Sequence, residues 1–320
     1  MRPHAPGHTG VEATDRALGA PPPGAADGGG PVIDSHVHFW DPRRLVYPWL
    51  AEAPPLNRPF TADDFAAAVP EPVEAVFVEA GRADDQAGQE LEWVRAMART
   101  RPWIRGAVVH VSLADIRSAA SRVARHAGDP FVVGVRRNAQ DEPPGYVSGP
   151  ELRAGVRLLG EAGLPFDACV REHQLPELAE LAEACPRTVI VLDHLGKPVP
   201  GRPGSSWRQA VARLARSGNV VCKLSGLATE AAPGTEPAVL VALLREALET
   251  FGPDRCLYGG DWPVMTLATR YATWLELVRA ALAGFPADAA DAVLRATAIR
   301  TYRLDRALPP GRHRTREEPA

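Results

Sequence analysis

The chain has 320 residues, of which 45% are hydrophobic and 23% charged, and its formal net charge at pH 7 is -3. These proportions are typical of a globular protein with a substantial core. The small net charge and the lack of a basic stripe with interleaved aromatics exclude nucleic acid as an expected partner. No window approaches the roughly 18 consecutive apolar residues of a membrane span. We therefore expect no nucleic-acid partner and no membrane partner.

Both ends of the chain differ in composition from its middle. Residues 1–30 are rich in Gly, Pro and Ala and lack the continuous apolar stretch of a secretory signal, so we expect a disordered tail. Residues 308–320 are polar and predict a second tail, which leaves 31–307 as a single domain. The cysteines are far apart, form no Cys-x-x-Cys pair and predict free buried thiols in a cytoplasmic protein: Cys169, Cys185, Cys222 and Cys256.

The domain begins with a β-branched run, 32–33, followed by Asp34, His36 and His38. Residues two apart in a strand project to the same face, so both imidazoles should point the same way from one strand end. Such a pair can share one metal ion or one substrate, although a histidine pair alone is often structural. Asp34 is in phase with the pair and could fix the tautomer of one imidazole.

A Pro-rich stretch, 41–60, follows Trp40 and carries Tyr47 and Trp49. A loop of about twenty residues inside a compact domain is unusual and tends to be functional or disordered. Its aromatic residues predict a lid or pocket wall, or simple packing, and the sequence leaves both open.

The remainder alternates short apolar runs with amphipathic segments. Thr61 and Asp64 have capping-box spacing, Ser112 is expected to cap a later helix, and Gly163 to end another. The predicted strands are 32–33, 75–78, 104–109, 131–135, 165–170, 188–192, 219–224 and 255–258. The predicted helices are 61–69, 89–99, 112–128, 151–163, 175–185, 207–215, 238–251, 271–283 and 287–304.

Eight apolar strands separated by amphipathic segments favour parallel strands that are buried on both faces. At this length we expect an α/β fold of the (β/α)8 TIM-barrel type, with a doubly wound open sheet as the alternative. In a barrel, chemistry occurs at the carboxyl ends of the strands. The residues that follow the predicted strands are His36, His38, Glu79, His110, Arg136, Arg171, His194, Ser225 and Asp261.

Histidines and a carboxylate from the first, sixth and eighth strands should therefore converge. Neutral imidazoles and a carboxylate are ligands suited to zinc and its neighbours, and a metal would polarise a carbonyl and acidify a bound water. Asp261 could take the proton of that water as a general base. Without a metal, the imidazoles could orient the carbonyl while Asp261 activates free water.

The sequence resembles the amidohydrolase superfamily of the amidohydrolase-2 type, and in particular its lactonase branch around fuconolactonase, rhamnonolactonase and 2-pyrone-4,6-dicarboxylate lactonase. The resemblance covers the chain from about 31 to 304. It depends on the motifs IDSHVHFWD at 33–41, YPW at 47–49, VR at 135–136, LDHLGKP at 192–198, KLSG at 223–226 and YGGDWPV at 258–264.

The resemblance implies a (β/α)8 barrel that opens a small polar lactone, derived from a sugar acid or otherwise carboxylated. The residues that match the catalytic and metal-binding positions are His36, His38, His194 and Asp261. Fuller metal sites in the superfamily carry a lysine or other bridging ligand on the fourth strand, where this chain has Arg136 and Arg137. We therefore expect one divalent metal, zinc or manganese, or none.

Further residues are expected to bind substrate: Arg136, Arg171, Glu79, Trp40 and Trp262. The planar guanidinium groups could hold carboxylate or lactone oxygens, or form salt bridges between loops. Two residues could line the pocket or be structural, His110 and Lys223. We expect His126 and His173 to be solvated. His4, His8 and His313 lie in the predicted tails, and we expect no site role for them.

Two alternatives remain open from the sequence. A metal-dependent decarboxylase of the same superfamily would use a similar set of residues and release carbon dioxide. A catalytically silent protein that binds sugar acids would show affinity without turnover. The expected partner is a small lactone, and the sequence sets no expectation for the oligomeric state.

Overall fold

The computed structural model describes residues 30–113 and 115–305. The expected tails, with His4, His8 and His313, lie outside these residues except for Gly30. Within the described ranges, no helix combines the length and apolar character needed to cross a bilayer. The four cysteines are buried and free, as predicted.

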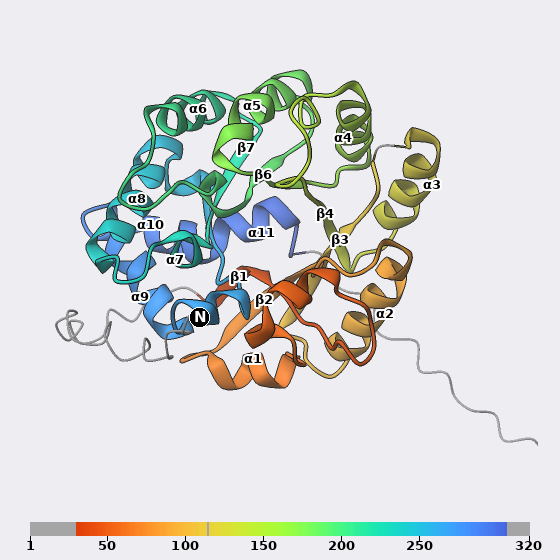
Figure 1. The fold of residues 1–320 in the computed structure, drawn as a ribbon, viewed down its shortest axis with the longest axis horizontal. Helices are drawn as coiled ribbons and strands as arrows, with labels where there is room; N and C mark the ends of the chain where they lie inside the picture. The colour runs from red at the N-terminus through yellow and green to blue at the C-terminus, as the bar shows by residue number, and fades with distance from the viewer. Residues whose placement is uncertain (1–29, 114, 306–320) are drawn as a thin grey trace, which may run out of the picture.

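Eight parallel strands form the centre of the molecule (Figure 1). They are β1 Val32–Val37, β2 Val73–Val78, β3 Ile104–His110, β4 Val132–Asn138, β5 Phe166–Cys169, β6 Ile190–Leu192, β7 Val220–Leu224 and β8 Cys256–Tyr258. Each strand pairs with the next one in the sequence. A parallel bridge between Val37 and Trp262 joins the first strand to the segment after the last. The predicted (β/α)8 barrel is confirmed, and the open-sheet alternative is wrong because the two edge strands meet.

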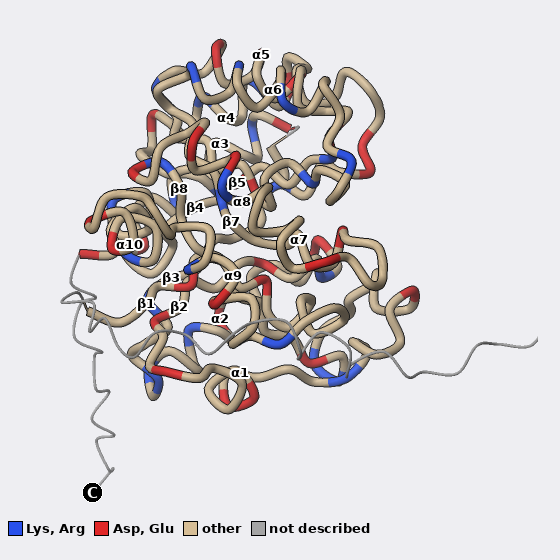
Figure 2. The backbone as a smooth tube through the Cα atoms, turned by 90° about the vertical axis from the view of Figure 1, so that its left-hand side faces the viewer, with Lys and Arg blue, Asp and Glu red and all other residues tan. Residues whose placement is uncertain are grey.

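Helices surround this barrel (Figure 1), and acidic and basic residues are interspersed along the backbone (Figure 2). The helices are α1 Ala62–Ala68, α2 Ala87–Ala98, α3 Ile116–Ala127, α4 Pro150–Ala162, α5 Leu175–Ala184, α6 Ser205–Arg216, α7 Leu227–Glu230, α8 Pro237–Phe251, α9 Tyr271–Leu282, α10 Ala289–Asp291 and α11 Thr297–Tyr302. The capping box of Thr61 and Asp64 is present at α1. Gly163 ends α4 in the left-handed conformation that a glycine adopts most easily.

One predicted helix start is wrong. Ser112 does not cap α3, because β3 continues to His110 and the chain stays extended at Asp115, whose side chain caps the helix by accepting from the backbone N–H of Arg117. The predicted helix 287–304 corresponds to one continuous helical stretch made of α10, a π-helical turn at Ala292–Ala296 and α11, and the π turn packs against β1 and β8. The short α7 was not predicted.

The interior of the barrel changes character along its axis. A buried apolar cluster, which includes residues near the amino ends of several strands, consists of Ile33, Val76, Val78, Val108, Val133, Val191, Leu257, Ala298, Tyr302 and Leu304. Ala298 and Tyr302 belong to α11, and Leu304 follows that helix. Arg105, at the start of β3, donates a hydrogen bond to the Leu304 carbonyl. The helix therefore closes the amino end, and polar residues occupy the barrel closer to the carboxyl ends.

Candidate active site

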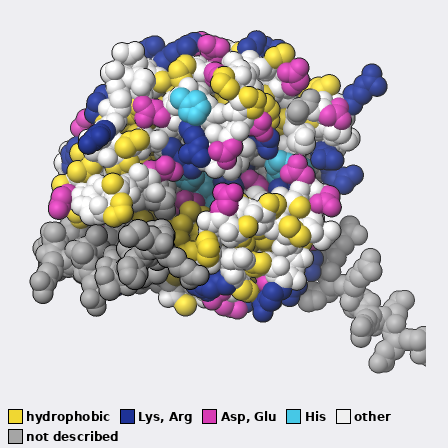
Figure 3. Space-filling model, viewed as in Figure 1, with side chains coloured by type: hydrophobic (Ala, Val, Ile, Leu, Met, Phe, Trp, Pro, Cys, Tyr) yellow, Lys and Arg dark blue, Asp and Glu magenta, His cyan; other side chains and the backbone are white. Residues whose placement is uncertain are grey.

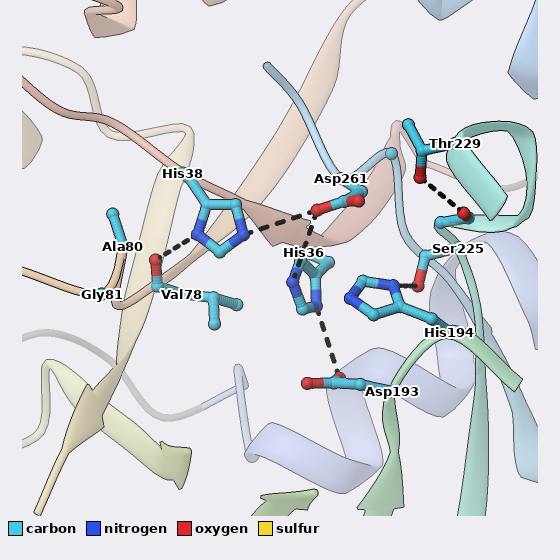
Figure 4. Close-up of polar contacts among 12 residues, drawn as sticks. His36, His38, Val78, Ala80, Gly81, Asp193, His194, Ser225, Thr229 and Asp261 are labelled. Atoms are coloured by element: carbon cyan, nitrogen blue, oxygen red, sulfur yellow. Dashed lines mark hydrogen bonds and ion pairs between the residues drawn. The ribbon is translucent and has the colours of Figure 1, made fainter. Parts of the chain in front are cut away.

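Four of the residues predicted from strand ends meet at the carboxyl end of the barrel (Figure 4): His36, His38, His194 and Asp261. The ring centroids of His36 and His194 are 4.6 Å apart. Asp261 Oδ1 lies 3.5 Å from His38 Nε2 and 3.8 Å from His36 Nε2. All four side chains are almost fully buried, and histidines line a central hollow among charged side chains (Figure 3).

Asp34 joins β1 to the Gly-Gly-Asp turn after β8. Its Oδ1 accepts from the backbone N–H groups of His36 at 2.9 Å and Gly260 at 2.8 Å. Its Oδ2 accepts from the Tyr271 hydroxyl at 2.8 Å, and a Cβ at Gly260 would clash with this oxygen. Burial raises the pKa of Asp34 to about 7, although these hydrogen bonds act to lower it. The predicted contact of Asp34 with an imidazole is wrong, because backbone groups and a tyrosine occupy both oxygens.

His38 is held by a main-chain carbonyl of the neighbouring strand. Its Nδ1 lies 2.8 Å from the Val78 oxygen. A carbonyl can only accept, so Nδ1 is the donor, which leaves Nε2 as the ring nitrogen available to another partner. That nitrogen faces Asp261 Oδ1. Two acceptors at this separation favour a proton or a cation between them.

His194 lies on a turn of unusual backbone conformation. His194 and Leu195 both have φ of 55°, and the Trp207 indole donates to the Leu195 carbonyl at 2.9 Å. His194 Nδ1 is 2.8 Å from Ser225 Oγ. A Cβ at Gly226 would lie only 2.5 Å from the same Nδ1, so the Lys-Leu-Ser-Gly motif makes room for this ring. Burial holds the pKa of His194 well below its usual range.

Asp261 has a φ of 58°, a left-handed conformation in which Asp and Asn are among the better tolerated non-glycine residues. Its backbone N–H donates to the His36 carbonyl at 2.8 Å. Burial opposes its ionisation, yet His194, His38 and the Lys197 charge lower its pKa below the ordinary value. The carboxylate is therefore ionised at neutral pH, as a general base requires.

The same side chains satisfy the requirements of a metal site. His36, His38 and Asp261 each offer one ligand atom within 4.8 Å of the others, and His36, Asp193 and His194 form a second such group. His36 Nε2 is buried without a hydrogen-bond partner among the described residues. Two imidazoles and a carboxylate suit zinc and similar ions, so this set fits one divalent metal. The fourth strand carries Arg136 two residues before its end, and a guanidinium is no ligand for a second metal.

A charged network that was not predicted from the sequence lies next to these residues. Lys223 Nζ lies 2.6 Å from Asp167 Oδ2, 3.0 Å from Asp193 Oδ1 and 3.1 Å from His36 Nδ1. The Tyr302 hydroxyl donates to Asp167 at 2.7 Å. Asp167 and Asp193 were not named as site residues, and Lys223 only as a residue that could line the pocket. The available signal was a charge in the middle of two apolar strand runs, 165–170 and 219–224.

Arg136 and Glu79 form a buried pair beside the site. Arg136 donates from Nε to Glu79 Oε1 at 2.8 Å and from Nη2 to the Glu79 carbonyl at 2.7 Å. Burial opposes the ionisation of Glu79, but Arg136 and Arg82 lower its pKa to about 2. Glu90 lies 3.8 Å from Arg82 Nε, and burial with the Glu79 charge raises its pKa to about 8. Glu79 is therefore the ionised partner of the two arginines.

This difference predicts that Glu79→Gln destabilises the fold at neutral pH by about 3–5 kcal/mol, since it leaves buried arginine charge uncompensated. The matched control Glu90→Gln should change stability little, because Glu90 is mostly protonated there. The pKa of Glu79 is lower in the folded state, so its contribution is complete above about 4.5 and lost as the pH falls through about 2. Urea unfolding of both variants across this range tests the assignment, which fails if Glu90→Gln costs more than Glu79→Gln.

Three of the residues expected to bind substrate have other contacts. Arg171 is 45% exposed and lies 3.1 Å from Asp141 Oδ1, which is the loop salt bridge considered as its alternative. Trp40 is fully buried, and its indole donates to two carbonyls of the 41–60 loop. Trp262 packs edge-on against Phe60. Both tryptophans thus pack against the loop, and their role as substrate contacts stays a prediction.

The 41–60 loop is folded onto the barrel, with two 3-10 turns at Pro48–Glu52 and Pro54–Leu56. The Trp49 indole donates to the Ala80 carbonyl at 2.8 Å, and Tyr47 is buried. The packing interpretation therefore describes these two aromatic residues. His110, also considered for the pocket, lies 3.5 Å from Asp84, and burial lowers its pKa to about 4. His173 is exposed as expected, whereas His126 is partly buried.

A closed (β/α)8 barrel with three imidazoles and an ionised carboxylate at its carboxyl end defines a class of enzymes that activate water against a carbonyl or related group. The comparison with known proteins identifies the family within this class. The chain belongs to the amidohydrolase family, whose model matches residues 33–304. The resemblance inferred from the sequence motifs is thus confirmed.

Proteins similar to this chain include two that are named L-fucono-1,5-lactonase. It is 34% identical over 294 residues to an L-fucono-1,5-lactonase of Burkholderia multivorans. The aligned region covers 85% of this chain and 96% of that protein. It is 30% identical over 286 residues to the L-fucono-1,5-lactonase of Burkholderia ambifaria, covering 86% and 96%. A crystal structure of a Burkholderia multivorans amidohydrolase with bound zinc is 32% identical, with a TM-score of 0.75, and covers 86% of this chain and 99% of that one.

Proposed function

We propose that this protein is a lactonase that opens the ring of a sugar-acid lactone by attack of water on the ester carbonyl. The observation that carries the proposal is the ionised Asp261 carboxylate beside the imidazoles of His36, His38 and His194. Two relatives at 30% and 34% identity are named L-fucono-1,5-lactonase, which makes an aldono-1,5-lactone the first substrate to test.

In the proposed reaction, Asp261 accepts a proton from water as the water oxygen bonds to the lactone carbonyl carbon. The carbonyl π electrons move to oxygen, where a donor from His36 or His194 stabilises the developing charge. When the carbonyl re-forms, the bond to the ring oxygen breaks, and Asp261 returns its proton to that oxygen. The product is an open-chain hydroxy acid, which releases a proton to solvent at neutral pH.

A divalent metal fits the residues His36, His38 and Asp261, with His194 adjacent, and would supply Lewis-acid polarisation of the carbonyl. The neighbouring cations are proposed to orient the substrate. Arg136 is held by Glu79, and Lys197 is held by Gln140 at 2.8 Å. Their positive charge suits the oxygen-rich face of a sugar acid.

Acid release from a panel of aldonolactones and carboxylated lactones, followed with a pH indicator, tests this function. We expect hydrolysis of at least one aldono-1,5-lactone. The assay is run on protein as purified and after chelation, with metal content measured in both. Loss of activity on chelation with recovery in zinc or manganese would make the metal essential, and retention in metal-free protein would assign the activation of water to Asp261 alone. Carbon dioxide release without lactone opening would overturn the proposal in favour of a decarboxylase.

A further inference from the structure

Lys197 is brought beside His194 by a left-handed turn. The four residues from His194 to Lys197 all have φ between 53° and 72°, and the Lys197 backbone N–H donates to the His194 carbonyl at 2.8 Å. In a turn closed by such a bond, the first and fourth residues lie on the same side. Three of the four are not glycine, although other residues rarely adopt this conformation. The backbone thus places an imidazole and an ammonium group on one side of the turn.

The Lys197 ammonium group lies at the edge of the site, between segments that follow two other strands. Its Nζ is 2.8 Å from Gln140 Oε1, in the segment after β4, and 3.3 Å from Glu230 Oε1, in α7 after β7. Its positive charge is one of the influences that lower the pKa of Asp261. The Lys197 side chain is 16% exposed, so a molecule bound beside Asp261 can contact it.

The charge of this ammonium group is compensated within the chain. Glu230 pairs with it, and the Glu230 side chain is only 28% exposed, which limits screening of the pair by solvent. Arg136 of β4 likewise donates to the carboxylate and the carbonyl of Glu79. A substrate carboxylate against either cation would therefore lie close to a resident carboxylate that repels it. A substrate hydroxyl meets no such repulsion, because it can accept from the cation and donate to the carboxylate.

We propose that the ion pair of Lys197 and Glu230 selects uncharged, polyhydroxylated lactones, and that Glu230 is the specificity-determining residue that disfavours lactones bearing a carboxylate. This selectivity rests on the proposed function and specifies the charge of its substrate. A hydroxyl of the lactone accepts from Lys197 Nζ and donates to the Glu230 carboxylate. Gln140, the other partner of Lys197, is an uncharged amide and leaves the charge balance of the pair unchanged.

Replacing Glu230 with Gln tests this selectivity with two substrates. One is the best uncharged aldonolactone of the panel, and the other is the lactone of the same ring size and configuration whose terminal carbon is a carboxylate. For the unmodified full-length chain, we expect kcat/KM to be about tenfold or more higher for the uncharged lactone. Glu230→Gln leaves the Lys197 charge uncompensated. It should raise kcat/KM for the carboxylated lactone by about tenfold, the value of one charge-assisted hydrogen bond, without raising that for the uncharged one.

Asp141→Asn is the matched control. It also removes one negative charge from a segment at the carboxyl end of the barrel, but from an exposed pair with Arg171, so the ratio of the two kcat/KM values should stay unchanged. Glu230→Gln combined with Lys197→Met should lose the gain, because the cation that receives the substrate carboxylate is then absent. The proposal is overturned if the unmodified chain does not prefer the uncharged lactone, or if folded Glu230→Gln protein keeps the original ratio.

Binding of the two matching lactams separates this selectivity from the lactonase assignment. A lactam has nitrogen in place of the ring oxygen and resists hydrolysis, so calorimetry gives its dissociation constant without turnover. A protein that opens no lactone but prefers the uncharged lactam, and loses this preference in Glu230→Gln, would refute the proposed function alone. Lactone opening with equal affinity for both lactams would refute only the role of Glu230. A protein that neither opens a lactone nor binds a lactam would overturn both proposals.

Discussion

Replacing Asp261 with Asn is expected to lower kcat for lactone opening by about 10²–10⁴-fold, the usual contribution of a general base. The carboxylate is ionised and lies 3.5 Å from His38 Nε2, whereas an amide cannot take a proton from water. Asn also tolerates the left-handed φ of 58° at this position, so the backbone should remain unchanged. Stopped assays with the best lactone of the panel give kcat, and thermal melts report on the fold.

Asp141→Asn provides the control for this substitution. It makes the same chemical change at an exposed acid that pairs with Arg171, and it should retain full activity. The role of Asp261 is contradicted if Asp261→Asn keeps more than a small fraction of wild-type kcat at an unchanged melting temperature. The catalytically silent alternative is supported if neither protein turns over any lactone while both bind a sugar acid equally.

Lys223→Met is expected to lower the free energy of unfolding by about 3–5 kcal/mol, as is usual when one member of a buried charged group is removed. Methionine keeps much of the length and apolar volume of the lysine side chain. It leaves Asp167 and Asp193 close together and fully buried without their shared cation. Urea denaturation of the metal-free protein at neutral pH measures this loss.

Lys223→Met combined with Asp167→Asn should recover part of the lost stability, because only one carboxylate then remains. Arg171→Met removes an exposed cation from a surface pair, so it should have little effect on unfolding. An unchanged free energy of unfolding for the single Lys223→Met variant would contradict the network described here. Equal losses in the single and double variants would place the cost in packing rather than in charge.

The barrel could be predicted because its strands are buried on both faces, which leaves a readable apolar run for each strand. Boundaries were less accurate where two signals competed. Ser112 and Asp115 are both good helix caps, and the choice depended on how far β3 continues. The π-helical turn between α10 and α11 lies where the helix packs against β1 and β8, which local periodicity does not record.

Some residues of the candidate site could be predicted from the sequence, and others depend on packing between distant segments. His36, His38, His194 and Asp261 lie at or within three residues of the carboxyl ends of strands, so fold class alone places them at one end of the barrel. The Lys223 network depends on distances between side chains of β5, β7 and the turn after β6, which are set only when the barrel closes. The loop packing of Trp40 and Trp262 could not be predicted from the sequence, because an aromatic residue beside a catalytic motif can face either the substrate or a covering loop.

The most direct test of the central claim is the initial rate of acid release from L-fucono-1,5-lactone and other aldono-1,5-lactones with the purified full-length chain. Spontaneous opening of each lactone in the same buffer is subtracted. The site described here predicts a rate proportional to enzyme concentration and well above the spontaneous rate for at least one of them. A rate no greater than the spontaneous one for every lactone, from folded protein with and without added zinc or manganese, would contradict it.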